Sequence, residues 1–124
     1  MSEIKTITDA LVNFRNERDW AQFHDTKNLA TAISIEAAEL NELFLWKTIK
    51  ESEDVAIEKI KEELADVFAY AFLLAEKHQL DVQQIVLDGI ALDLARQHAD
   101  RAAVTDLQWD QPCAGSHQGA VQFL

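Results

Sequence analysis

The sequence predicts an all-α domain, a four-helix bundle-like architecture that is completed by oligomerisation. Apolar residues recur every three or four positions through most of the chain, which is typical of amphipathic helices. Only 3 glycines and 1 proline occur among the 124 residues, so little material is present for turns between β-strands. This length suits one domain, which we expect over residues 1–101 with a C-terminal tail over residues 102–124.

Four stretches carry the helical period, and short polar or aromatic segments separate them. Thr26 suits the N-cap of the second helix, and Asp81 with Gln84 resembles a capping box at the start of the fourth. After Ala102 the period is lost among Gln, Gly, Pro and Ser residues. The helices are therefore predicted over about residues 4–19, 26–47, 52–78 and 81–100.

Charge and composition exclude several classes of partner. The net charge of -11 argues against nucleic acid or an anionic membrane, although an anionic small molecule remains possible if a divalent metal bridges it to the acids. The single Cys113 permits no internal disulfide, and residues 1–5 lack the pattern of a signal segment. The longest apolar stretch, residues 67–75, is too short to span a bilayer. We expect a cytoplasmic protein.

Two acidic motifs interrupt the second and third predicted helices. Glu36 with Glu39, and Glu63 with Asp66, each place two carboxylates one helical turn apart. Glu36 lies in the middle of its helix's apolar stripe, where an unpaired charge costs several kcal/mol or more. In an antiparallel hairpin the four acids reach about the same level, because each pair lies at a matching distance from the loop over residues 48–53.

These four carboxylates predict a metal site. Oxygen ligands without an accompanying Cys or His suit a hard cation, so Glu36, Glu39, Glu63 and Asp66 are expected to hold Mg²⁺, with Mn²⁺ as a possible substitute. The alternative is that the acids belong to surface faces, with lysines as ion-pair partners. The apolar stripe around Glu36 favours the metal.

The stretch from residue 67 to residue 75 predicts an oligomer. It is apolar on every side of the third predicted helix, and such a helix must be covered on every side. In so small a domain, a second subunit is the expected cover.

Taken together, these motifs resemble those of the MazG-like all-α nucleoside triphosphate pyrophosphohydrolases. The similarity rests on both acidic motifs, on the preceding Trp20-x-x-Phe23-His24, and on residues 27–46, and it covers roughly residues 15–86. The similarity is greatest to the single-domain branch of this family, whose members resemble dCTP pyrophosphatase. The resemblance implies an enzyme that cleaves (deoxy)nucleoside triphosphates between the α- and β-phosphates with Mg²⁺, for nucleotide-pool housecleaning. It also implies homo-oligomers, as dimers or dimers of dimers, with active sites at subunit contacts.

The resemblance also suggests roles for individual residues. Glu36 or Glu39 is the candidate general base, because a carboxylate not fully committed to the metal can accept a proton from water. Trp20, His24 and Trp46 are candidates to stack on the base, since every nucleobase offers a π-face. Asn28 is a candidate to hydrogen-bond the base edge or the sugar. A structural role would explain His24 equally well.

The last predicted helix departs from the family pattern. Many relatives carry a lysine and an asparagine there, whereas this chain has Gly89 and Asp93, followed by Arg96. We expect Asp93 to join the site as a fifth acid and Arg96 to contact phosphate. The substrate's base and sugar are not indicated by these residues.

Three rival interpretations remain. The first is a non-catalytic helical oligomerisation module that binds metal or nucleotide through the same acids. The second is a carboxylate-bridged di-iron bundle, which is disfavoured because no histidine follows a glutamate by three positions. The third is a purely structural oligomer in which the acids form ion pairs between helices.

Overall fold

The computed structural model describes residues 2–105, in which helices and turns are present and no strand occurs. The all-α prediction is therefore confirmed. No helix within this part of the chain is both long and apolar enough to cross a membrane. The elements are α1 Glu3–Glu17, the 3-10 helix η1 Trp20–Phe23, α2 Thr26–Glu42, α3 Ile49–Ser52, α4 Ile57–Lys77 and α5 Val82–Thr105.

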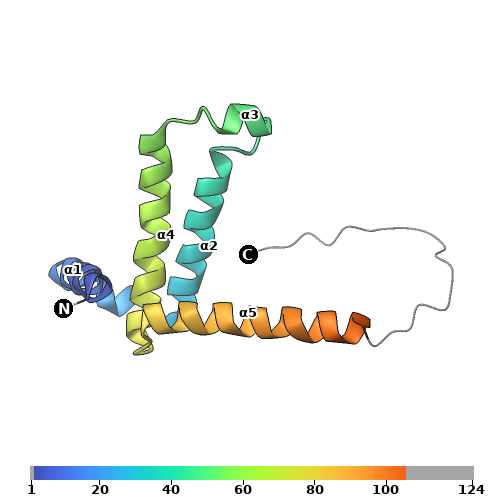
Figure 1. Cartoon of the computed structure of the whole chain (residues 1–124). Coiled ribbons are helices and arrows are strands. Elements are labelled where there is room, and N and C mark those ends of the chain that lie inside the picture. The colour runs from blue at the N-terminus through green and yellow to red at the C-terminus, as the bar shows by residue number, and fades with distance from the viewer. Residues whose placement is uncertain (1, 106–124) are drawn as a thin grey trace. The chain divides into compact units, whose positions relative to one another are not determined.

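The described residues fall into two units that divide after Asp88, so α5 begins in the first unit and continues into the second. Within the first unit, α2 and α4 lie side by side as an antiparallel hairpin, with α3 at its tip (Figure 1). The predicted boundary after residue 101 falls inside α5, and most of the predicted tail lies outside the described residues. That domain division stays a prediction.

A few contacts hold the first unit together. Leu29 of α2 is 2% exposed, and Leu73 and Ala75 of α4 are also buried. The Thr26 hydroxyl lies 3.0 Å from Nε2 of His78, which joins the start of α2 to the end of α4. Helix α1 packs on α4, where Nη1 of Arg15 lies 3.4 Å from a carboxylate oxygen of Glu76.

Helix α2 begins one residue earlier than a Thr26 cap would require. Asp25 is the N-cap, because its carboxylate accepts a hydrogen bond from the Asn28 amide at 2.7 Å. Asp81 does accept a hydrogen bond from the Gln84 amide, as predicted. However, the Gln84 side chain donates to Asp88 at 2.8 Å, so the reciprocal half of the predicted capping box is replaced by another contact.

The tip of the hairpin differs most from the sequence-based expectation. Helix α2 ends at Glu42 rather than near residue 47, because the chain tightens into turns such as the bond from the Lys47 amide to the Phe44 carbonyl at 3.0 Å. The expected loop instead contains α3, and α4 begins at Ile57 rather than near residue 52. At the other end, α5 continues about one turn beyond its predicted end, to Thr105.

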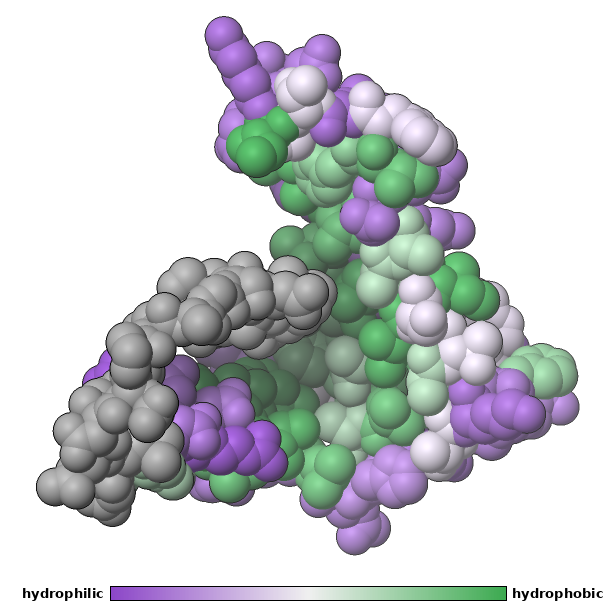
Figure 2. Space-filling view, turned by 90° about the vertical axis from the view of Figure 1, so that its right-hand side faces the viewer, coloured by the Kyte–Doolittle hydropathy of each residue, from purple (hydrophilic) through white to green (hydrophobic). Residues whose placement is uncertain are grey.

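The core of this unit is small for its apolar content. Large hydrophobic side chains such as Ile35, Ile57 and Phe68 are more than half exposed. Figure 2 shows hydrophobic residues gathered over the visible face of the hairpin, beneath the tip that carries α3. The isolated chain therefore leaves apolar surface uncovered.

Candidate metal centre

Three of the predicted acids meet between α2 and α4. Glu36, Glu39 and Glu63 each offer a carboxylate oxygen, and these oxygens lie within 4.8 Å of one another. Glu36 and Glu63 are half-buried, whereas Glu39 is exposed. The arrangement follows from the one-turn spacing on α2 and the antiparallel pairing with α4. Glu63 joins the cluster and its neighbour Glu62 does not.

Asp66 lies close to these acids without belonging to the three-oxygen cluster. Its charge raises the pKa values of both Glu36 and Glu63, so it faces the same region of the hairpin. The structure thus brings the four acids that the sequence predicted into one electrostatic unit, which we call the acid cluster: Glu36, Glu39, Glu63 and Asp66.

Two members of the acid cluster, Glu36 and Glu63, have raised pKa values. Desolvation by burial is the main reason that the pKa of Glu36 is raised, and the charges of Glu39 and Asp66 add to it. The pKa of Glu63 is raised first by desolvation and then by the same two charges. The structure shows no ion pair between a basic residue and these acids within residues 2–105. The ion-pair alternative is therefore not supported within one chain.

The donor set fits a hard divalent cation. All of the candidate ligands are carboxylate oxygens, which Mg²⁺ and Mn²⁺ prefer. Octahedral coordination at about 2.0–2.1 Å places neighbouring ligands roughly 3 Å apart and opposite ligands roughly 4 Å apart. The limit of 4.8 Å on the separations of the three oxygens is close to this spacing. A cation would also offset the mutual repulsion of the carboxylates.

Tyr70 is a site residue that the sequence reasoning missed. It lies one turn after Asp66 on α4, and desolvation followed by the charges of Glu36 and Asp66 raises the pKa of its hydroxyl. Its ring packs edge-on against His24, with centroids 6.2 Å apart. The four-residue spacing from Asp66 was the available signal. Tyr70 connects the acid cluster to the aromatic link, which is η1 together with His24.

His24 has a lowered pKa and a ring nitrogen without a hydrogen-bond partner in the described part of the chain. Burial lowers the pKa of its ring, and the charge of Arg15 lowers it further. Its Nδ1 is buried and has no hydrogen-bond partner within residues 2–105. A buried unpaired ring nitrogen is costly, so a ligand that hydrogen-bonds to it would be stabilised. The binding role of His24 stays a prediction.

The two tryptophans have different surroundings. Trp20 contacts the Phe14 ring edge-on at 5.7 Å, and the Arg18 guanidinium lies over the Phe14 ring at 3.4 Å from its centroid. Trp46 lies in the turn after α2 and is 91% exposed. Trp20 is therefore held in place by its neighbours, whereas a pocket around Trp46 would need atoms from outside this unit.

The remaining predicted binding residues already have local partners. The Asn28 side-chain amide donates to the Phe23 carbonyl at 3.0 Å, which fastens the aromatic link to the start of α2. On α5, Nη1 of Arg96 lies 3.7 Å from a carboxylate oxygen of Asp93. Both of these α5 residues belong to the second unit, so their expected contribution to the site stays a prediction.

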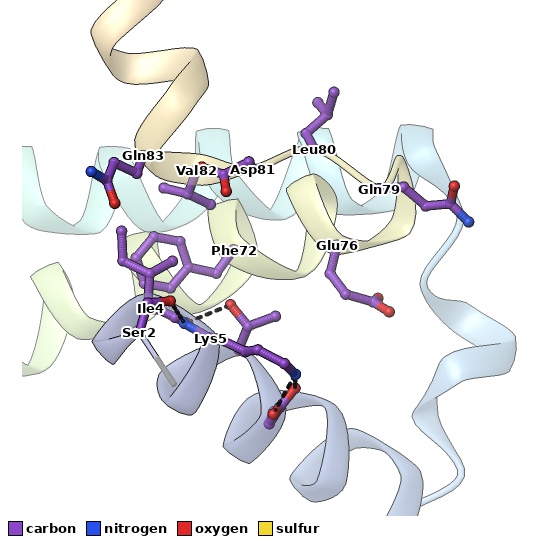
Figure 3. A pocket seen from close by; sticks show the side chains of 12 residues that line it. Ser2, Ile4, Lys5, Phe72, Glu76, Gln79, Leu80, Asp81, Val82 and Gln83 are labelled. Atoms are coloured by element: carbon purple, nitrogen blue, oxygen red, sulfur yellow. Dashed lines mark hydrogen bonds and ion pairs between the residues drawn. The ribbon is translucent and has the colours of Figure 1, made fainter.

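A separate hollow of about 460 Å³ lies at the other end of the hairpin, where α1 begins and α4 turns toward α5 (Figure 3). Lys5 and Asp9 pair there at 2.8 Å, and Ser2 accepts a hydrogen bond from the Lys5 amide at 3.2 Å. These polar groups are thus occupied by one another. The acid cluster, rather than this hollow, is the candidate metal centre.

Comparisons with known proteins agree with this geometry. The profile of the MazG-like family matches residues 31–110, which include all four acids. The chain is 38% identical to human dCTP pyrophosphatase 1 over 97 residues, covering 72% of this chain and 55% of that protein. It is 40% identical to bovine dCTP pyrophosphatase 1 over 79 residues, which cover 60% of this chain and 47% of the bovine protein. The chain thus spans about half the length of the curated relatives it matches.

A solved structure gives the same result for the fold. The crystal structure of a pyrophosphatase from Archaeoglobus fulgidus superposes with a TM-score of 0.73 at 31% sequence identity. The match covers 77% of this chain and 93% of the archaeal one.

Proposed function

Because the chain belongs to the MazG-like family, we propose that it is a metal-dependent nucleoside triphosphate pyrophosphohydrolase. The single observation that carries this proposal is the meeting of Glu36, Glu39 and Glu63 in a chain similar to dCTP pyrophosphatases. The reaction is hydrolysis between the α- and β-phosphates, and its products are a nucleoside monophosphate and pyrophosphate.

The acid cluster would hold the metal, which we propose to be Mg²⁺ with Mn²⁺ as a substitute. When bound, such an ion neutralises phosphate charge and lowers the pKa of water. Glu36 is our candidate to accept the proton from the attacking water, and Glu39 is the alternative. Glu36 is half-buried, whereas Glu39 is exposed.

The aromatic link would receive the nucleoside. Trp20 supplies a ring for stacking and His24 offers its unpaired Nδ1. The Tyr70 ring contacts His24, and the charges of Glu36 and Asp66 act on its hydroxyl. We keep Asn28 as a further contact to the sugar or base, and Asp93 with Arg96 as contacts to the phosphates. Trp46 lies at the hairpin tip, so it would contact the base of a substrate that is held by another copy of the chain. The similarity to dCTP pyrophosphatases favours a deoxyribonucleotide substrate.

We propose that the active protein is a homo-oligomer, a dimer or a dimer of dimers. A groove of about 360 Å³ between α1 and α4 is lined by Ile7, Leu11, Ala65, Phe68, Ala69 and Phe72. These side chains are apolar, and burying each Phe or Leu contributes about 1.5–3 kcal/mol. A helix from a second copy would cover the groove and add to a core in which only Leu29, Leu73 and Ala75 are buried within the described residues.

The cellular role that fits these features is control or housecleaning of the nucleotide pool in the cytoplasm. The single Cys113 supports a reducing compartment. The net charge of -11 also fits a small-molecule substrate that is bound through a cation, rather than a nucleic acid.

The decisive experiment is a panel of canonical and damaged nucleoside triphosphates with Mg²⁺, scored for monophosphate and pyrophosphate. We expect turnover by the wild type and its loss in Glu39→Gln and Asp66→Asn. Nucleotide binding without cleavage would favour the non-catalytic binding module instead. If no nucleotide is turned over, or if both variants keep full activity, the proposed enzyme function is wrong.

A further inference from the structure

A hollow of about 460 Å³ lies at the tip of the hairpin, between the end of α2, the α3 turn and the start of α4. Its lining includes Leu43, Lys47, Asp54 and Lys59. We propose that this hollow, which we call the tip pocket, binds the pyrophosphate end of the substrate and the pyrophosphate product. The proposal rests on the proposed function, because it assigns a subsite to that reaction.

The tip pocket lies directly beyond the acid cluster. Leu43 follows Glu39 by four residues, and Lys59 precedes Glu63 by four residues. Residues four apart on a helix are neighbours on one face, about 5–6 Å apart at Cβ. Both walls of the pocket are thus one turn from a carboxylate of the cluster. A substrate whose scissile phosphate lies at the acids would extend its remaining phosphates toward the tip.

The two lysines of the tip pocket are available for an anion. Neither the Lys47 nor the Lys59 ammonium has an ion-pair partner within residues 2–105. Lys61, only two residues from Lys59, is instead paired with Glu58 at 2.9 Å. The lining pairs these two lysines with two acids, so Lys47 and Lys59 are the groups in the pocket that a phosphate chain would contact.

Of the two acids that also line the pocket, one is already occupied. The Glu51 carboxylate accepts a hydrogen bond from the Thr48 backbone amide at 2.7 Å. This bond, helped by the Lys47 charge, lowers the pKa of Glu51. Asp54 lines the same pocket and would repel phosphate. Because the lysines attract phosphate and Asp54 repels it, substitutions at these positions should have opposite effects. Removing a lysine should weaken pyrophosphate binding, and removing the Asp54 charge should strengthen it.

The test is inhibition of nucleotide turnover by added inorganic pyrophosphate in the presence of Mg²⁺. We expect Lys47→Met and Lys59→Met each to raise the half-inhibitory concentration of pyrophosphate by about 10-fold, the size typical of one charge-assisted contact. Asp54→Asn should lower it. Inhibition by the nucleoside monophosphate should change less than 2-fold, since that product lacks the outer phosphates.

Lys61→Met is the matched control, because it removes an equal charge from the same helix at a position that is already paired. This variant should be inhibited by pyrophosphate as strongly as the wild type. Lys59→Arg keeps the positive charge, so it should also be inhibited as strongly as the wild type, unlike Lys59→Met. Circular dichroism of each variant shows whether the fold is kept, and Lys59→Gln replaces Lys59→Met if the latter does not fold. The proposal is overturned if Lys61→Met weakens inhibition as much as Lys59→Met, or if neither pocket lysine matters.

The same variants separate this proposal from the proposed enzyme function. If the wild type turns over no nucleotide, calorimetry of Mg²⁺ with inorganic pyrophosphate still measures the subsite directly. Weaker pyrophosphate binding by Lys47→Met and Lys59→Met would then support the tip pocket while the enzyme function fails. Equal binding by all of the variants would refute the tip pocket whatever the activity.

Discussion

The middle and the tip of the α2–α4 hairpin are stabilised in different ways. The part of the hairpin that carries the acids lies on two long helices that pack on each other, and Leu29 nearby on α2 is 2% exposed. At the tip, Trp46 and Ile49 are 91% and 87% exposed, and hydrogen bonds within a few residues define the backbone. Packing therefore fixes the positions of the acids, whereas local bonds set the shape of the tip.

The two regions also differ in local charge, because the middle carries only acids whereas the tip pocket has two lysines and two acids. The middle gathers carboxylates whose mutual repulsion contributes to the raised pKa values of Glu36 and Glu63. The tip pocket presents Lys47 and Lys59 without ion-pair partners in the described part of the chain. The two proposed sites follow this difference: the cation would bind in the middle of the hairpin, and the pyrophosphate anion would bind at its tip.

The largest expected effect is the loss of metal binding on neutralising one acid of the middle. Glu63→Gln should weaken Mg²⁺ or Mn²⁺ binding, measured by calorimetry, by more than the roughly 10- to 100-fold that outer-shell partners of a metal cost. Its matched control is Glu62→Gln, an adjacent substitution outside the cluster, which should change the affinity less than 2-fold. Equal losses in the two variants would mean that general negative charge, and not a built site, attracts the cation.

A packing prediction tests the same comparison through stability. Leu29→Ala should lower the free energy of unfolding by about 2–5 kcal/mol, because it leaves a cavity beneath the hairpin. Leu45→Ala, the same substitution at the exposed tip, should change it by less than about 0.5 kcal/mol. Denaturant unfolding at one fixed protein concentration measures both values. A large effect of Leu45→Ala would show that the tip is covered in the assembled protein.

The contrast between middle and tip also explains what the sequence could predict. The acid cluster was predictable because helical periodicity places Glu36 in an apolar stripe and selects Glu63 over Glu62. Antiparallel pairing of two long helices then brings the acids to one level. In a regular helix the spacing of residues in the sequence determines their positions in space, so the positions of the acids in the middle of the hairpin could be predicted from residue spacing.

The tip did not follow from spacing. Its backbone depends on the bonds between Thr48 and Glu51, which close a separate helical turn, and on tightened turns after Glu42. These short-range hydrogen bonds decide whether the segment forms a helix or a turn, and they leave no periodic pattern of apolar residues in the sequence. Tyr70 was missed for another reason, since it continues the apolar face of α4 and only its contact with His24 reveals its connection to the aromatic link.

A smaller effect is expected at the cap of α3. Thr48→Ala removes the hydroxyl that accepts from the Glu51 amide at 3.2 Å and breaks the capping box. The cost to α3 should be about 1 kcal/mol. Hydrogen exchange should become faster at residues 49–52 while the rate in α2 and α4 stays unchanged. Thr31→Ala, an exposed substitution on α2, is the control, and faster exchange throughout the hairpin would show that the tip and the middle are coupled.

The smallest effects are opposite pH dependences in the two regions, because interactions between exposed charges are worth little. Glu36 has a folded-state pKa above its ordinary value of 4.5, so the metal-free folded chain binds that proton more tightly than the unfolded chain. Its contribution to stability is therefore greatest below about pH 4.5 and is lost as the pH rises through the raised pKa. Glu36→Gln should melt higher than the wild type at pH 8 in EDTA, and this advantage should vanish near pH 4.

Glu51 should behave in the opposite way. Its pKa is lowered by the bond from the Thr48 amide, so its contribution is present above the ordinary value of 4.5 and is lost as the pH falls through the lowered pKa. Glu51→Gln should therefore melt slightly lower than the wild type at neutral pH, with the difference shrinking in acid. Adding Mg²⁺ should make Glu36→Gln melt lower than the wild type, since only the wild type has the full set of metal ligands. The difference in melting temperature between Glu51→Gln and the wild type should stay unchanged. If Mg²⁺ shifts both differences equally, the cation does not distinguish the middle of the hairpin from its tip.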